Sequence, residues 1–149
     1  MITIIELDKT AFSADVICLG EQFSKIVQCI NQIVPSLRWY CGDVESVSNV
    51  EQWKTGKLLQ RIGSAAEILR LAEPIVQFMS GVFLGVDCVV QHLDSPLHIE
   101  TEDLTVIPLD NRFVQINCFD TSMFWIATND PVVLAVLQCF RTSGKFMAG

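Results

Sequence analysis

The chain of 149 residues has few charged side chains and no long hydrophobic run. Charged residues make up 18% and apolar residues 50%, yet the longest stretch without a charge is only the thirteen residues 74–86. A membrane-spanning helix needs about 20 apolar residues, so the sequence predicts none. The opening residues, MITIIELD, lack the basic start of a secretory signal peptide. We therefore expect a cytoplasmic protein.

Paired cysteines are also lacking. The six cysteines contain no CxxC spacing of the kind that zinc sites use, and most lie inside apolar segments. A chain of this length buries a core large enough to fold without disulfide cross-links. We interpret the cysteines as small buried side chains, and we predict no metal site and no cofactor.

Basic residues are scarce in the second half of the chain. Residues 87–130 contain eight acidic residues and one basic residue, Arg112, so this segment carries the −7 net charge of the whole chain. Nucleic-acid binding needs the opposite sign, because phosphates must be neutralised. An acidic surface instead attracts cationic proteins. Nucleases are one such class, since they bind phosphates, and an inhibitor can mimic that charge.

The usual catalytic motifs are missing. The sequence has no GxSxG elbow, no complete phosphate loop around TGK at 55–57, and no calcium-loop spacing of carboxylates. Cys88 and His92 are close in sequence, but the apolar surroundings of Cys88 indicate a buried side chain rather than a nucleophile. We predict no catalytic residues and expect that the protein is not an enzyme.

The densest polar stretch, QHLDSPLHIETEDLTVIPLD at 91–110, contains both histidines. His92 and His98 are six residues apart, which does not fit a helical i, i+4 metal pair. On a strand they would share a face, but Pro96 argues against a regular strand there. The alternative function is a small enzyme or a ligand- or metal-binding protein that uses His92, His98 and the neighbouring carboxylates. Trp53 is either an exposed aromatic anchor or a core residue.

Periodicity predicts one α+β or α/β domain over residues 1–149, with a mixed sheet of five to six strands and about three helices packed on it. The expected strands are 2–7, 37–47, 81–90, 113–119 and 123–128. The expected helices are 12–34, ended by Pro35; 64–81, begun by a Ser64–Glu67 capping box and kinked at Pro74; and 131–141, capped by Asp130. Residues 48–63 are either a loop or a short helix stopped by Gly63, and 142–149 are expected to be a frayed tail.

Four segments resemble a known family. In this order, LRWYCGDVES, VQFMSGVFLGV, ETEDL and VQINCFDTSMFWIAT resemble the small bacterial immunity proteins encoded beside contact-dependent inhibition and other polymorphic toxins. The phrase DTSMF between two apolar strands and the acidic pair before them carry the resemblance, which covers about residues 37–140. It implies a single cytoplasmic α/β or α+β domain that binds one toxin domain, often an RNase or DNase, and blocks it. Toxin-contacting residues vary within such families, so the resemblance assigns no site.

The predicted binding surface rests on charge alone. We expect a basic toxin domain, in particular a nuclease, to contact the acidic region, and we expect neither nucleic acid nor a membrane as partner. The predicted partner-binding residues are Asp94, Glu100, Glu102, Asp103, Asp110 and Asp120. Self-association through the surplus of apolar residues remains open.

Overall fold

The computed structural model of the protein describes residues 1–87 and 97–143. In this part of the chain, six strands form one sheet in the order β1-β6-β5-β4-β2-β3, and every neighbouring pair is antiparallel. The strands are β1 Thr3–Leu7, β2 Arg38–Ser48, β3 Gln60–Gly63, β4 Ile75–Val86, β5 Phe113–Phe119 and β6 Met123–Thr128. The helices are α1 Lys9–Phe12, α2 Gly20–Ile33, α3 Ala65–Ala72 and α4 Pro131–Ser143, with a short 3-10 turn, η2 Thr101–Asp103. The α+β class of the prediction is confirmed, but the expected mixed sheet is wrong, because all the described strand pairs are antiparallel.

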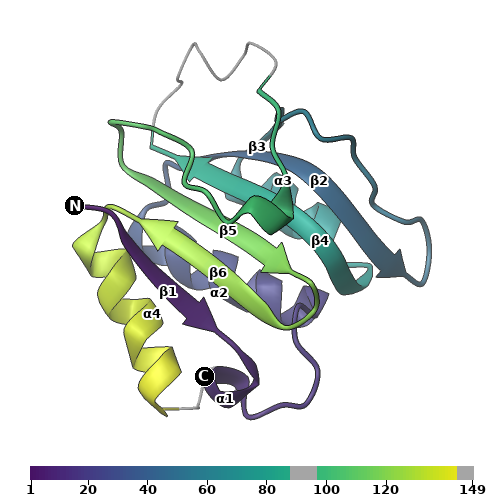
Figure 1. The fold of residues 1–149 in the computed structure, drawn as a ribbon, viewed down its shortest axis with the longest axis horizontal. Coiled ribbons are helices and arrows are strands. Elements are labelled where there is room, and N and C mark those ends of the chain that lie inside the picture. Colours follow the sequence, from purple (N-terminus) through teal and green to yellow (C-terminus); the bar gives the residue numbers. More distant parts are fainter. Residues whose placement is uncertain (88–96, 144–149) are drawn as a thin grey trace.

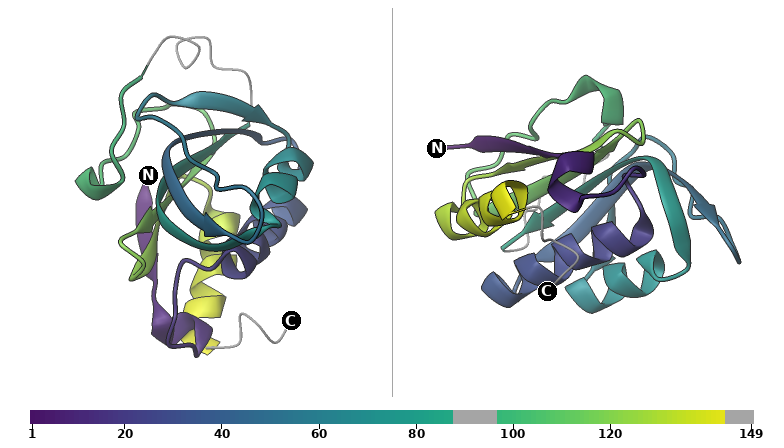
Figure 2. Two further views of the ribbon diagram at one scale, coloured as in Figure 1. Left: turned by 90° about the vertical axis from the view of Figure 1, so that its right-hand side faces the viewer. Right: turned by 90° about the horizontal axis from the view of Figure 1, so that it is seen from below.

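The helices cover one face of the sheet, and the segment 97–109 crosses the other (Figures 1 and 2). Between helices and sheet lies the main core, where the rings of Phe23, Phe78 and Phe83 pack with centroids 4.5 to 5.2 Å apart. Trp53 packs its ring against Phe78 and Phe83 at 5.8 and 5.4 Å. Of its two interpretations, the core-facing one is therefore correct.

A second, smaller core lies on the opposite face of the sheet. Buried Tyr40, Leu84, Phe113 and Trp125 form part of it. Apolar residues of the segment 97–109, hereafter the acidic segment, cover them, namely Leu97, Ile99, Leu104, Val106, Ile107 and Leu109. The acidic segment is therefore a packed layer of the fold, and its charged residues Glu100, Glu102 and Asp103 lie between these apolar ones.

The predicted helix 12–34 is wrong in its first half. Helix α1 ends at Phe12, and the chain then passes through Ser13 and Cys18, both in the left-handed backbone region, before α2 begins at Gly20. A Cβ at Gly20 would lie 2.2 Å from the carbonyl oxygen of Ile75. Gly20 therefore allows the helix to start in close contact with β4, which the apolar spacing alone did not indicate.

The predicted helix 64–81 is also wrong in its second half. Helix α3 ends at Ala72, and β4 begins at Ile75 and pairs with both β2 and β5. Pro74 ends the helix rather than kinking it, because proline has no N–H to continue the helical hydrogen bonds. Glu73, just before it, still has helical backbone angles, and its N–H donates to the Leu69 carbonyl at 3.0 Å. At the start of α3 the prediction is supported, since the Ser64 N–H donates to Glu67 Oε2 at 3.1 Å.

Strands β1 and β2 and the β5–β6 hairpin lie where expected. The predicted strand 81–90 is confirmed for residues 81–86, which end β4; Asp87 lies beyond the strand, and 88–90 lie outside the described residues. The end of 48–63 forms strand β3, where a loop or a short helix was expected. Asp130 caps α4, accepting hydrogen bonds from the Val132 and Val133 amides at 2.8 and 3.1 Å. Helix α4 runs to Ser143, so the first two residues of the predicted frayed tail are helical, and 144–149 lie outside the described residues. No helix in the described ranges is long and apolar enough to cross a membrane.

Candidate partner-binding surface

The acidic segment begins beside the loop that leads into β3. His98 forms an isolated antiparallel bridge with Leu58. On either side of it, the Ile99 N–H donates to the Lys57 carbonyl at 2.7 Å and the Leu59 N–H donates to the Leu97 carbonyl at 2.8 Å. These bonds fix the start of the segment, so the charged residues that follow have a defined place on the sheet.

Thr101, which is buried, fastens η2 to the sheet. Its backbone N–H and its Oγ1 both donate to Asp43 Oδ2, at 2.8 and 2.9 Å. Oγ1 also accepts from the Gly81 N–H at 3.0 Å, and the Thr101 carbonyl accepts from Asn117 Nδ2 at 3.2 Å. Three strands thus hold this one residue.

Gln115, buried on β5, holds the next part of the segment. Its Oε1 accepts from the Ile107 N–H, and its Nε2 donates to the Thr105 carbonyl, both at 2.9 Å. Its Nε2 also donates to Asn117 Oδ1 at 3.0 Å. Buried amides with satisfied partners order the segment that they bind. These hydrogen bonds therefore hold η2 and the residues that follow it in a fixed position on the sheet.

An acidic hollow of about 370 Å³ opens between η2 and the strands β2 and β4. Four carboxylates and one ammonium group line it; its residues are Asp43, Glu45, Lys57, Met79, Ser80, Glu100 and Glu102. Asp43 lies at a bulge of β2 with a φ of 53°, and its carbonyl accepts from Ser80 Oγ at 2.7 Å. The bulge turns the side chain of Asp43 toward η2.

Lys57 is the basic residue in the lining of the hollow, and it forms an ion pair there. Its Nζ lies 2.7 Å from Glu100 Oε1. The hydrogen bond to Glu100, together with the charges of Glu100, Asp43 and Glu102, raises the pKa of Lys57. In turn the hydrogen bond and charge of Lys57 lower the pKa of Glu100. Both shifts favour the charged forms of the two side chains, and solvent screens this exposed pair.

The structure brings together three of the six predicted partner-binding residues. Glu100, Glu102 and Asp103 lie in or next to η2. Asp110 precedes β5 and Asp120 follows it, so the two lie at opposite ends of a seven-residue strand, roughly 20 Å apart. Asp94 lies outside the described residues. The predicted residues therefore form one cluster at η2 and two separate exposed acids.

Asp43 and Glu45 were missed as members of the surface. A signal did exist, because two acids lie within a strand whose other residues are mostly apolar, two positions apart. Such a pair marks a solvent-facing side of a strand. Pairing between β2 and β4, and the anchoring of η2 on both, is what places these acids beside Glu100 and Glu102.

The described residues give little support to the alternative interpretation, an enzyme, ligand or metal site that uses the histidines. His98 is exposed and borders a cavity of about 140 Å³ between the acidic segment and the sheet. That volume is well below the roughly 300 Å³ at which small-molecule sites begin. Within the described residues, no three histidine, cysteine or carboxylate side chains gather as a group that could hold a metal ion. His92 and Cys88 lie outside them.

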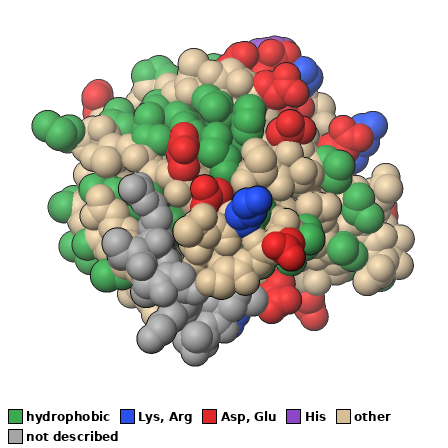
Figure 3. All heavy atoms as spheres, turned by 60° about the horizontal axis from the view of Figure 1, so that its bottom comes forward, with side chains coloured by type: hydrophobic (Ala, Val, Ile, Leu, Met, Phe, Trp, Pro, Cys, Tyr) green, Lys and Arg blue, Asp and Glu red, His purple; other side chains and the backbone are tan. Residues whose placement is uncertain are grey.

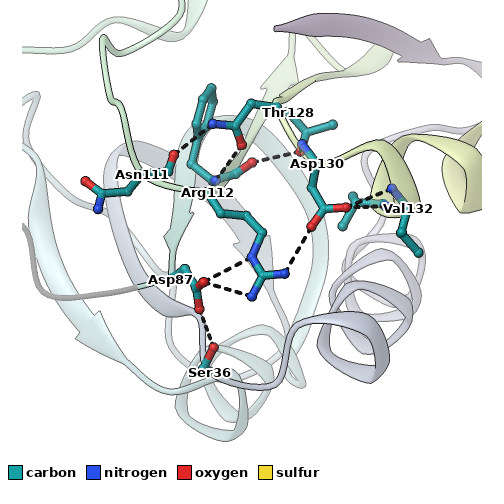
Figure 4. Close-up of polar contacts among 10 residues, drawn as sticks. Ser36, Asp87, Asn111, Arg112, Thr128, Asp130 and Val132 are labelled. Carbon is teal, nitrogen blue, oxygen red and sulfur yellow. Dashed lines mark hydrogen bonds and ion pairs between the residues drawn. The ribbon is translucent and has the colours of Figure 1, made fainter. Parts of the chain in front are cut away.

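Arg112, the single base of the acidic region, is occupied in an ion-pair cluster (Figure 4). Its Nε and Nη2 donate to Asp87 Oδ2 at 3.0 and 2.8 Å, and its Nη1 lies 3.4 Å from Asp130 Oδ2. Ser36 Oγ donates to the second oxygen of Asp87. The cluster joins the end of β4, the start of β5 and the first turn of α4. We assign it a structural role, because its charges satisfy one another.

Comparison of the chain with protein-family models, with curated proteins and with solved structures gives no match. The fold and the surface together define a single α+β domain with an acidic hollow on the sheet face opposite the helices.

Proposed function

We propose that this protein is a cytoplasmic immunity protein, which binds a basic bacterial toxin domain such as a nuclease and blocks it. The observation that carries the proposal is the acidic hollow: four carboxylates and one lysine, fixed to the sheet through Thr101 and Gln115. A preformed acidic surface loses little entropy on binding and speeds encounter with a cationic partner. The resemblance of residues 37–140 to toxin immunity proteins supplies the class of partner.

Apolar side chains beside the hollow also suit a protein partner. Met79 is 42% exposed within its lining, and Val47 is 45% exposed on the neighbouring stretch of β2. Protein interfaces combine an apolar centre with a charged rim. A partner lysine or arginine can therefore rest its aliphatic stem on Met79 while its charged end meets Glu45 and Glu102.

The test reverses the charge of two carboxylates, Glu45 and Glu102, which form no ion pair within the described part of the chain. The double variant Glu45→Lys/Glu102→Lys keeps Lys57–Glu100 and the Thr101 anchor intact. The matched control is Glu21→Lys/Glu73→Lys, which changes the net charge equally on the helix-covered side.

We expect the gene directly upstream to encode the toxin domain, as in the family that the sequence resembles. Cells that express that gene product should lose protection with the first variant and keep it with the control. Equal protection by both variants would show that the acidic hollow is not the binding surface. Circular dichroism of each purified variant checks that the fold is retained.

A further inference from the structure

β1 is an open edge of the sheet. It pairs with β6 alone, in continuous register from Thr3↔Thr128 to Leu7↔Phe124. An edge strand offers unpaired N–H and C=O groups to a further strand, and proteins usually protect it with proline, lysine or a bulge. The strand TIIEL has none of these. Within the described residues, no strand pairs with the outer edge of β1, and Glu6 is the single charged side chain of the strand.

The exposed side of β1 lies on the same face of the sheet as the acidic hollow. Ile5 and Leu7 are buried in the core beneath the helices, so Ile4 and Glu6 point to the opposite face. Ile4 is 47% exposed and pairs with Ala127 of β6, which belongs to the second core. Figure 3 shows hydrophobic side chains gathered over one area of the surface, with acidic side chains within it and along its border.

A second hollow of about 460 Å³ follows β1, and its lining combines apolar and acidic groups. It is lined by Ile4, Glu6, Asp8 and Thr10. One oxygen of Asp8 accepts from the Thr10 N–H at 2.9 Å. The lining contains two carboxylates and no basic residue, so an occupant with a complementary charge must be cationic. A second copy of this acidic chain would repeat the same carboxylates and is disfavoured.

We propose that an extended basic segment of the partner adds to β1 as a further antiparallel or parallel strand, with an apolar side chain against Ile4 and a lysine or arginine at Glu6. Backbone hydrogen bonds would supply affinity, and the side chains of alternate residues would supply specificity. This inference rests on the proposed function and gives the toxin domain a second contact. Strand β1 lies four strand spacings from β2, roughly 19 Å. One interface footprint of about 800 Å² spans both hollows.

The test uses as probe the purified product of the gene directly upstream, which we expect to contain the toxin domain. Amide hydrogen exchange of residues 1–8 is measured in the free protein and in the complex, and strand addition predicts slower exchange of the β1 amides in the complex. Ile4→Lys and Glu6→Lys should each weaken binding by roughly tenfold. The controls Val132→Lys and Glu73→Lys, exposed positions of equal charge change on the helix-covered side, should change it by less than about twofold.

The outcomes distinguish failure of the strand addition from failure of the proposed function. If Glu45→Lys/Glu102→Lys abolishes binding while β1 amides exchange equally fast in both states, the strand addition is overturned and the proposed function stands. If β1 amides become protected in the protein alone as its concentration rises, the occupant is a second copy and the inference is wrong. If the wild-type protein does not bind the toxin domain, both proposals fall together.

Discussion

At the scale of single residues, the cysteines differ in their access to reagents. Cys18, Cys41 and Cys118 are buried, whereas Cys139 is exposed. Burial raises the pKa of Cys41 to about 12 and holds that of Cys118 well above its usual range. Thiolates are the reactive form, so these two buried thiols should be the least reactive.

We therefore predict that iodoacetamide labels Cys139 in the native protein while Cys41 and Cys118 react only after unfolding. Peptide mass spectrometry of native and denatured samples measures this difference. Equal labelling rates for Cys41 and Cys139 under native conditions would contradict the packing of β2.

Asp87 should make stability depend on acid pH. Its hydrogen bonds from Ser36 and Arg112 lower the pKa of the folded-state carboxyl below its ordinary value of 3.8. A lowered pKa means that the stabilising contribution is present above the ordinary pKa and is lost as pH falls through the folded-state value. Urea unfolding at a series of pH values below about 5 should show a shallower loss of stability for Asp87→Asn than for the wild type.

The matched control for this effect is Asp110→Asn, an exposed carboxylate for which no ion pair is found in the described residues. Its pH dependence should follow that of the wild type. If Asp87→Asn follows the wild type as well, the ion-pair cluster of Arg112 is not formed in solution.

At the scale of elements, the start of α2 depends on a close backbone approach. Alanine usually stabilises a helix by about 1 kcal/mol relative to glycine. At Gly20, however, the added Cβ would meet the Ile75 carbonyl oxygen at 2.2 Å, and backbone on both sides has little freedom to move. We predict that Gly20→Ala lowers the free energy of unfolding by about 1 to 3 kcal/mol, whereas Gly56→Ala, with nothing within 4 Å, changes it little. Thermal and urea unfolding of both variants decide the point.

The anchor of η2 can be broken without changing the shape of its side chain. Thr101→Val removes the hydroxyl that bonds Asp43 and Gly81. Leaving a buried amide and a carboxylate without this partner should cost about 1 to 3 kcal/mol. We predict faster amide exchange across residues 97–107 and weaker toxin binding. Thr105→Val, at an exposed side chain, serves as the control and should have neither effect.

Sequence patterns identified elements whose local and tertiary preferences agree. The hairpin of β5 and β6 and the Asp130-capped helix α4 are examples, because turn and cap residues mark their boundaries. Residues 75–80 were misassigned to a helix, since Ile75, Val76 and Met79 fit a helical stripe as well as they fit a strand. Pairing of β4 with β2 and β5, which no local pattern reveals, decides between them.

At the scale of the whole molecule, the charge of the sequence located an acidic cluster but not all of its members. The acidic cluster at η2 was expected, and its partners Asp43 and Glu45 come from a strand more than fifty residues away in sequence. Asp110 and Asp120 were grouped with it by sequence proximity, but β5 separates them. The net charge of a segment can be counted from the sequence and is the same in the folded protein. The residues that make up one surface patch, however, depend on which strands lie side by side.

The central claim is that the acidic hollow binds a basic toxin domain. Its most direct test uses the purified product of the gene directly upstream, which we expect to contain the toxin domain. The association rate of that product with this protein is measured by surface plasmon resonance over a range of salt concentrations. We predict a one-to-one complex whose association rate falls steeply with salt, and a further drop of roughly tenfold for Glu45→Lys/Glu102→Lys. No binding, or an association rate indifferent to both salt and this variant, would contradict the account.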